Sequence, residues 1–160
     1  MNTEPYGTTL FCDDIRHETR GKLTLIGCYS SELNFSAPQP GLLPTFAALV
    51  NIRIPRAVKF NSIKVSVLKE EGADITKIVE TAIDVPESSN NGVSEDITSG
   101  EINDIVTYIT LPLQWSPLSF KEPGFIKVRA YLDGDREIRL GALKINFPNS
   151  VSENTASETG

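Results

Sequence analysis

A chain of 160 residues is long enough to bury a hydrophobic core and short enough to form a single domain. Its formal net charge of -6 is atypical of nucleic-acid binders, whose phosphate contacts require clustered lysine and arginine. The composition, 39% hydrophobic and 22% charged, is typical of a globular protein rather than a disordered or fibrous one.

The sequence has no pattern typical of a segment that directs a protein to a membrane or to secretion. The opening MNTEPYGTT has no basic segment followed by an apolar one, so we expect no secretory signal. No apolar run approaches the roughly 20 residues that cross a bilayer. Two cysteines, Cys12 and Cys28, are too few for a disulfide framework or for a zinc site built on cysteine alone. We therefore expect a cytoplasmic protein.

The first predicted element is a hairpin. TTLFCDDIRHE is predicted as one strand and KLTLIGCYS as its partner, with TRG as the turn and Gly21 at the position that needs a positive φ. Pairing about Arg20 gives three opposed pairs, which are Cys12 with Cys28, Asp14 with Ile26, and Arg16 with Thr24. The two thiols would then lie close together, although a slip of one residue is an open alternative.

Period-two alternation predicts the strands that follow. In TFAALVNIRIP one face carries five apolar side chains, Phe46, Ala48, Val50, Ile52 and Ile54. The other face carries Ala47, Leu49, Asn51 and Arg53, which predicts a strand buried mainly on one side. Similar alternation occurs in SIKVSVLKEEG, KIVETAIDVP, DIVTYITLPLQW and GFIKVRAYLDG.

Turn residues separate these strands. KEEGAD is predicted as a turn and ESSNNGVSEDITSG, residues 87–100, as a polar loop. The Asp-Gly in YLDGDREIRL predicts a tight hairpin. After it the apolar positions change from even to odd numbers, which predicts a β-bulge at Gly141.

Together these elements predict an all-β fold of about seven to nine strands. Crossing loops favour an immunoglobulin-like sandwich of two antiparallel sheets over residues 1–148, followed by a disordered polar tail at 149–160. EPGFIKVRAYLDGDREIRLGALKINF resembles the last two strands of many bacterial immunoglobulin-like domains. That resemblance implies a fold type and no function.

The candidate polar cluster lies in the first hairpin and consists of Asp13, Asp14, Arg16, Glu18 and Lys22. Strand alternation predicts that Asp13 and Asp14 point to opposite faces, so they could not share a proton as a catalytic pair does. In one interpretation an aspartate is partly buried and fixes the hairpin. In the other, these acids meet Asp133 and Asp135 from a loop and bind a hard cation. We favour the first interpretation.

The same hairpin segment, FCDDIRHETRGKLTLIGCYS, resembles the N-terminal signature of a family of uncharacterised bacterial and phage proteins. The matching positions are Cys12, Asp13, Asp14, Ile15, Arg16, Glu18, Gly21, Lys22, Leu25, Ile26, Gly27 and Tyr29. LLPTFAALV and the closing Pro-Gly strand with Tyr-Leu-Asp-Gly extend the resemblance over most of residues 10–147. The resemblance implies a family without an assigned activity, so no catalytic residue can be carried over from it.

Three other features of the sequence are candidate functional sites. His17 is the single histidine, so we do not expect a histidine-centred catalytic triad. Asp133-Gly134-Asp135 is interpreted as a hairpin turn rather than a cation loop. Trp115 is interpreted as closing one end of the core, rather than forming an exposed surface with Leu118 and Phe120.

We therefore expect a non-enzymatic protein that binds a protein partner or its own copies, with exposed edge strands available for pairing. The alternative is a protein that binds a divalent cation or a small nucleotide-like anion, or a hydrolase. In that alternative Arg16 and Lys22 hold the anionic group and an aspartate holds the cation. We predict no catalytic residue, no metal ligand, no cofactor, and no nucleic-acid or membrane partner.

Overall fold

The computed structural model describes residues 4–84 and 106–148. These residues form twelve strands and one short 3₁₀ turn at Thr19–Gly21. The strands are β1 (Tyr6–Cys12), β2 (Asp14–His17), β3 (Leu23–Ile26), β4 (Glu32–Asn34), β5 (Gly41–Leu43), β6 (Phe46–Pro55), β7 (Ser62–Glu71), β8 (Asp74–Asp84), β9 (Val106–Trp115), β10 (Leu118–Phe120), β11 (Gly124–Leu132) and β12 (Arg136–Asn146). The predicted polar loop at 87–100 and the predicted tail at 149–160 lie outside the described residues.

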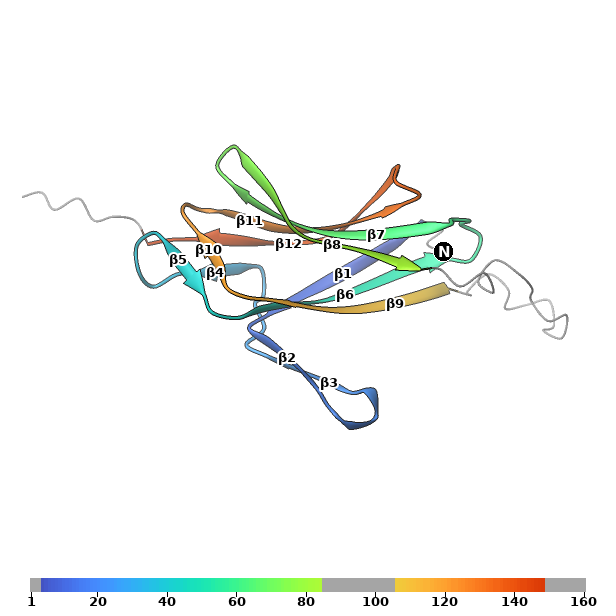
Figure 1. Ribbon diagram of the computed structural model, residues 1–160, viewed down its shortest axis with the longest axis horizontal. Helices are drawn as coiled ribbons and strands as arrows, with labels where there is room; N and C mark the ends of the chain where they lie inside the picture. Colours follow the sequence, from blue (N-terminus) through green and yellow to red (C-terminus); the bar gives the residue numbers. More distant parts are fainter. Residues whose placement is uncertain (1–3, 85–105, 149–160) are drawn as a thin grey trace, which may run out of the picture.

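Two sheets face each other, as predicted for a sandwich (Figure 1). One has the order β4-β12-β11-β7-β8, and the other has the order β1-β6-β9. β10 pairs with β5, and β2 pairs with β3 in a hairpin that lies outside the two layers, on the outer side of the β1-β6-β9 sheet. The all-β sandwich is confirmed, whereas its immunoglobulin-like character stays a prediction. The expected number of about seven to nine strands was too low, because twelve are present among the described residues. No helix among the described residues has the length and apolarity needed to cross a membrane.

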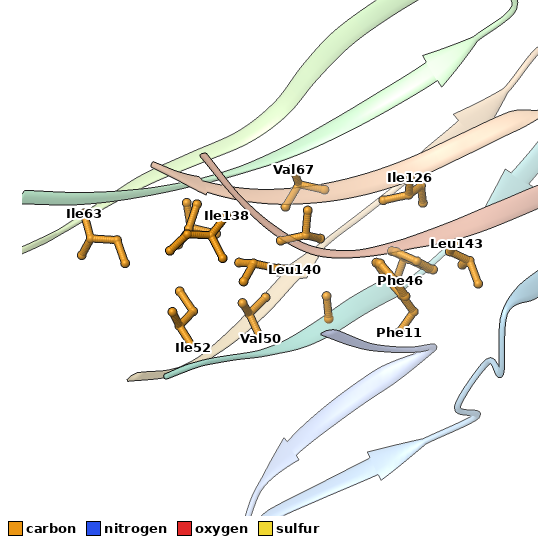
Figure 2. Close-up of a cluster of buried hydrophobic side chains, with 14 of the residues drawn as sticks. Phe11, Phe46, Val50, Ile52, Ile63, Val67, Ile126, Ile138, Leu140 and Leu143 are labelled. Carbon is orange, nitrogen blue, oxygen red and sulfur yellow. The ribbon is translucent and has the colours of Figure 1, made fainter. Parts of the chain in front are cut away.

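The core lies between the sheets, where alternating side chains of β6, β7, β11 and β12 meet (Figure 2). The predicted inward face of β6, from Phe46 to Ile54, is fully buried there. Opposite it lie buried side chains such as Ile63, Val67 and Ile126. Each such side chain contributes about 1.5–3 kcal/mol when it leaves water, so this layer is the main source of stability.

Trp115 closes one end of this core. Its ring meets Phe46 edge-on, with 5.2 Å between the ring centroids. Leu118 and Phe120, on β10, are buried in the same cluster. The interpretation of Trp115 as a core residue is confirmed, and the alternative of an exposed surface with Leu118 and Phe120 is wrong.

The predicted bulge is also present. Val128 of β11 lies opposite Gly141 of β12, but the next residue, Arg129, lies opposite Arg139. Leu140 is therefore the extra residue of β12, and both Ile138 before it and Leu143 after it are buried. The bulge keeps the apolar side chains of β12 on the inner face despite their change of parity.

One predicted strand is interrupted. TTLFCDDIRHE was expected to run continuously, but β1 ends at Cys12 and β2 begins at Asp14. β1 pairs with β6, whereas β2 pairs with β3. The chain therefore changes partner at Asp13.

Candidate functional site

The β2–β3 hairpin has the predicted register. Asp14 lies opposite Ile26, and Arg16 lies opposite Thr24. The turn contains Arg20 and Gly21, both with positive φ, and the Glu18 amide donates to the Lys22 carbonyl at 2.8 Å. The prediction of a TRG turn with Gly21 at positive φ is confirmed.

Asp13 joins the hairpin to the sandwich. Its backbone N–H donates to the carbonyl oxygens of Ile26 at 2.9 Å and Gly27 at 3.3 Å. Its carboxylate accepts a hydrogen bond from the Tyr29 hydroxyl. Burial of the phenol, and then the hydrogen bond and charge of Asp13, raise the pKa of Tyr29. Asp13 is thus held by contacts that fix the chain where it changes sheets.

Gly27 makes room for this carboxylate. A Cβ atom added at Gly27 would lie 2.0 Å from Asp13 Oδ2, far inside van der Waals contact. Gly27 also has a φ of 66°, in the left-handed region that favours glycine. Two independent features of this position therefore require glycine.

Asp14 is held by a different strand. The Gln114 side-chain amide of β9 donates to Asp14 Oδ1 and to the Ile15 carbonyl, both at 2.8 Å. Arg16 Nε lies 3.7 Å from Asp14 Oδ2, in an exposed pair of the kind that contributes about 0–1 kcal/mol. Asp14 therefore ties β2 to β9, and Arg16 adds little.

Asp13 and Asp14 both line a surface cavity of about 530 Å³, together with Thr45, Phe46, Gln114, Trp115 and Ser116. Separate donors hold the two carboxylates, Tyr29 for Asp13 and Gln114 for Asp14. The prediction that alternation sends Asp13 and Asp14 to opposite faces fails in its premise, because Asp13 lies between two strands and not within one.

The other predicted site residues lie elsewhere. Glu18 and Lys22 are exposed on either side of the hairpin turn, at the opposite end of β2 from Asp13. Asp133 lies in the β11–β12 turn and lines a different cavity, beside β7 and β8. Across the two described ranges, no group of three or more histidine, cysteine, aspartate or glutamate residues could hold a metal ion.

Asp133 has a structural role of its own. Its Oδ1 accepts hydrogen bonds from the backbone amides of Asn61 and Ser62, each at 2.9 Å. These bonds, first from Asn61 and then from Ser62, lower the pKa of the Asp133 carboxyl. With positive φ at Asp133 and Gly134, the interpretation of this segment as a hairpin turn is confirmed.

Cys12 lies under the hairpin, buried together with Ile15 and Ala47. Burial, and to a smaller extent the charge of nearby Cys28, raises the pKa of the Cys12 thiol from 9.0 to about 11. The unfolded chain releases this proton at the ordinary pKa, whereas the folded chain retains it to higher pH. The stability that Cys12 contributes is therefore complete below pH 9 and is lost as pH rises through about 11.

We expect the free energy of unfolding to fall between pH 9 and pH 11, the interval set by the two pKa values of Cys12. Urea denaturation followed by circular dichroism at several pH values measures this fall. The Cys12→Ala variant should have a flatter profile over the same interval. Identical profiles for the two proteins would contradict the assignment to Cys12.

A second candidate site lies on the outer face of the β1-β6-β9 sheet. Tyr6, Arg53 and Tyr108 occupy adjacent positions on its three strands. Arg53 Nη1 donates to the Tyr6 hydroxyl at 3.1 Å, and the guanidinium carbon lies 4.9 Å from the centroid of the Tyr108 ring. With Leu10 on the same face of β1, these residues form what we call the tyrosine–arginine face.

The tyrosine–arginine face is open to solvent. Tyr108 is 64% exposed, Leu10 49% and Tyr6 37%. A surface cavity of about 420 Å³ lies among Tyr6, Gly7, Thr8, Asn51, Arg53 and Tyr108. Sequence reasoning missed this face because its members are far apart in the chain. One available signal was Arg53, a charged residue on the outward side of the most regular strand.

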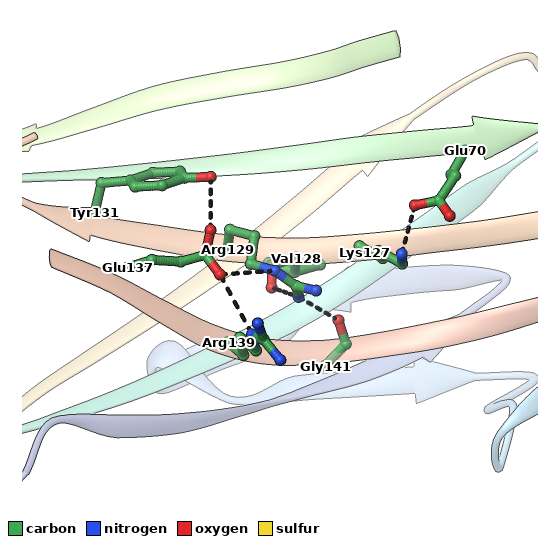
Figure 3. A network of polar contacts seen from close by, with 8 residues as sticks. All are labelled: Glu70, Lys127, Val128, Arg129, Tyr131, Glu137, Arg139 and Gly141. Atoms are coloured by element: carbon green, nitrogen blue, oxygen red, sulfur yellow. Dashed lines mark hydrogen bonds and ion pairs between the residues drawn. The ribbon is translucent and has the colours of Figure 1, made fainter. Parts of the chain in front are cut away.

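On the outer face of the opposite sheet, unlike the tyrosine–arginine face, charged side chains pair with one another (Figure 3). Glu137 Oε1 lies 3.6 Å from Arg129 Nε and 3.4 Å from Arg139 Nε, and Lys127 pairs with Glu70. The charges there largely compensate one another. By contrast, the contacts of Arg53 within the described residues are with tyrosines, and no described carboxylate forms an ion pair with it.

Comparison with known protein families matches residues 8–142 to a family of unknown function (DUF6941). The matched span contains the whole β2–β3 hairpin, Arg53 and Tyr108. A comparison with curated proteins finds no match.

Proposed function

We propose that this chain, which belongs to the family of unknown function DUF6941, is a non-enzymatic module that binds a protein partner through the tyrosine–arginine face. The observation that carries the proposal is the stack of Tyr6, Arg53 and Tyr108 across three neighbouring strands on an open face. Tyrosine and arginine are among the residues that contribute most to protein–protein binding energy.

Two of the four edge strands favour binding through a face over pairing at an edge. The terminal strands of the two sheets, among the described residues, are β4 and β8 in one and β1 and β9 in the other. β8 contains a bulge at Ile78, because Val67 pairs with Val79 but Leu68 pairs with Lys77. β9 contains Pro112, which lacks the N–H that an added strand would need. Bulges and prolines of this kind hinder strand addition, so the proposal departs from the predicted use of exposed edges.

The charge of Arg53 indicates the chemistry of the partner. A guanidinium between two aromatic rings is positioned to accept a carboxylate in a charge-assisted contact. Leu10, on the same face, offers an apolar contact beside it. We therefore propose a partner surface that presents a carboxylate flanked by apolar side chains. Because the hairpin segment resembles a signature of bacterial and phage proteins, we propose a bacterial or phage source, and we propose the cytoplasm as the compartment in which the partner binds.

A photo-reactive amino acid at position 108, introduced in cells of the source organism, tests this function. Tyr108 is 64% exposed, and Ile75 on β8, at 66%, is a matched control position. We expect one defined cross-linked protein from position 108, and its loss by about tenfold or more in the Arg53→Ala variant. Arg139→Ala, which changes an exposed arginine on the opposite sheet, should leave the product unchanged.

Two results would contradict the proposal. One is the same set of products from positions 75 and 108, and the other is a product that is insensitive to Arg53→Ala. If the cross-linked protein is a second copy of this chain, light scattering should show a dimer that Arg53→Ala dissociates.

The cation, anion or hydrolase alternative has less support. Asp13 is held by Tyr29, Asp14 is held by Gln114, and Lys22 lies beyond the far end of β2. A site for an anion and a cation would require these residues to converge with free ligand atoms.

A further inference from the structure

Backbone hydrogen bonds on both sides of Cys12 and Cys28 bring their two chain segments together. The Tyr29 amide donates to the Phe11 carbonyl at 2.8 Å, and the Asp13 amide donates to the Gly27 carbonyl at 3.3 Å. These bonds join the residues on either side of Cys12 to the residues on either side of Cys28. The two bonds bracket the cysteines as they would a non-hydrogen-bonded pair of antiparallel strands, in which the two side chains lie closest, although β3 itself ends at Ile26 and Gly27 has a positive φ.

That backbone arrangement suits a disulfide. Residues in a non-hydrogen-bonded pair have Cα atoms about 4.5 Å apart, and disulfides span Cα separations of about 4.4–6.8 Å. Both cysteines are free thiols here. They differ in access, because Cys28 is exposed whereas Cys12 is buried with Ile15 and Ala47.

We propose that Cys12 and Cys28 form a two-thiol modification site that reacts with low-molecular-weight disulfides. The exposed Cys28 thiolate attacks one sulfur of the reagent, whose S–S bond breaks and releases one thiolate. Cys12 then loses its proton to solvent and attacks the Cys28 sulfur, which displaces the second reagent thiolate. Overall, two protein thiols are oxidised to one disulfide while the reagent is reduced to two thiols.

The two steps differ in their pH dependence. Burial keeps the pKa of the Cys12 thiol above its ordinary value, so little attacking thiolate is present near neutral pH. The mixed disulfide on Cys28 should therefore accumulate first. The second step should accelerate about tenfold for each pH unit until the pH approaches the pKa of Cys12.

The internal disulfide would change how the hairpin is attached. It would join the end of β1 to the segment after β3, and so enclose the whole β2–β3 hairpin in a covalent loop. Closing such a loop restricts the unfolded chain and raises the melting temperature. The site is independent of the tyrosine–arginine face and of the partner proposed for it.

Mass spectrometry of the full chain incubated with oxidised glutathione tests the proposal. We expect wild-type protein to gain one glutathione, and then to lose it as a Cys12–Cys28 disulfide forms, faster at pH 9 than at pH 7. Cys12→Ala should keep the glutathione adduct, and Cys28→Ser should remain unmodified.

Peptide mapping of wild-type protein identifies the linkage without relying on any variant. A wild-type adduct that persists at pH 9, disulfides between separate chains, or no reaction at Cys28 would each overturn the proposal. A mapped Cys12–Cys28 peptide, with a melting temperature above that of the reduced protein, would support it.

Discussion

Replacing Phe46 with alanine should lower the free energy of unfolding by about 3–5 kcal/mol, the range for truncating a fully buried aromatic side chain. Phe46 begins β6 and is buried where the two sheets meet. Its ring lies 6.0 Å from Phe11, 5.9 Å from Tyr29 and 5.2 Å from Trp115, measured between centroids. Its loss would leave a cavity bordered by aromatic side chains from three other segments, which cannot all move inward to fill it.

Urea denaturation followed by circular dichroism measures this cost. Leu42→Ala is a suitable control, because Leu42 is 60% exposed on β5 and should cost no more than about 0.5 kcal/mol. A domain has about 5–15 kcal/mol of stability in total, so Phe46→Ala should be close to unfolding at 37 °C. A cost similar to that of Leu42→Ala would show that Phe46 is not at the centre of the core.

The register of the first hairpin could be predicted from the sequence because two local features agree. The Arg20-Gly21 pair supplies the positive φ values of a tight turn, and alternation then determines which residues lie opposite each other. The bulge at Gly141 could be predicted for a similar reason, because a change of parity in an apolar strand requires an extra residue.

The break at Asp13 could not be predicted in this way. No glycine or proline interrupts residues 8–18, and the break depends on contacts with distant residues. Tyr29 donates to Asp13, and Gln114 of β9 donates to Asp14. The strands β4, β5 and β10 were also missed, because a segment of three residues is too short to show a period.

The outer side of β6 was predicted incorrectly in part. Ala47 was expected on the more exposed side, but it is fully buried beneath the hairpin with Ile15, and Leu49 packs against the same cluster. Arg53, farther along β6, is exposed as predicted. The hairpin therefore covers one end of the outer face of this sheet and leaves the tyrosine–arginine face open at the other.

This arrangement relates the hairpin signature to the proposed function. The contacts of Asp13 and Asp14 hold the β2–β3 hairpin against the sheet, where Leu23 and Leu25 help to cover Ala47 and Leu49. Under the proposed function, the two aspartates act through the position of the hairpin rather than through chemistry of their own. They limit the open surface to the end of the sheet that carries Arg53.

Gly27→Ala should be the most damaging small substitution in this hairpin. The new Cβ would lie 2.0 Å from Asp13 Oδ2 and would displace the carboxylate from Tyr29. A left-handed φ costs a non-glycine residue about 1–2 kcal/mol, and the loss of the part-buried Tyr29–Asp13 hydrogen bond adds about 1–3 kcal/mol. We therefore expect a total loss of about 2–5 kcal/mol in the free energy of unfolding.

Gly21→Ala is the matched control. Gly21 also has a positive φ, of 71°, but a Cβ added there would meet no atom within 4 Å. The Gly21→Ala variant should lose only about 1–2 kcal/mol of the free energy of unfolding, the cost of the left-handed backbone. The difference between the two variants, about 2 kcal/mol, is then the contribution of Asp13 and its contacts.

The central claim, that Asp13 is a structural anchor of the hairpin, is tested most directly by repeating this comparison in an Asp13→Ala background. Removing the carboxylate leaves only the Asp13 Cβ, at 3.2 Å, near the position of the added methyl group. Urea denaturation of the four variants should show the excess cost of Gly27→Ala over Gly21→Ala only when Asp13 is present. Equal costs in the wild-type background, or an excess that persists without the carboxylate, would contradict the claim.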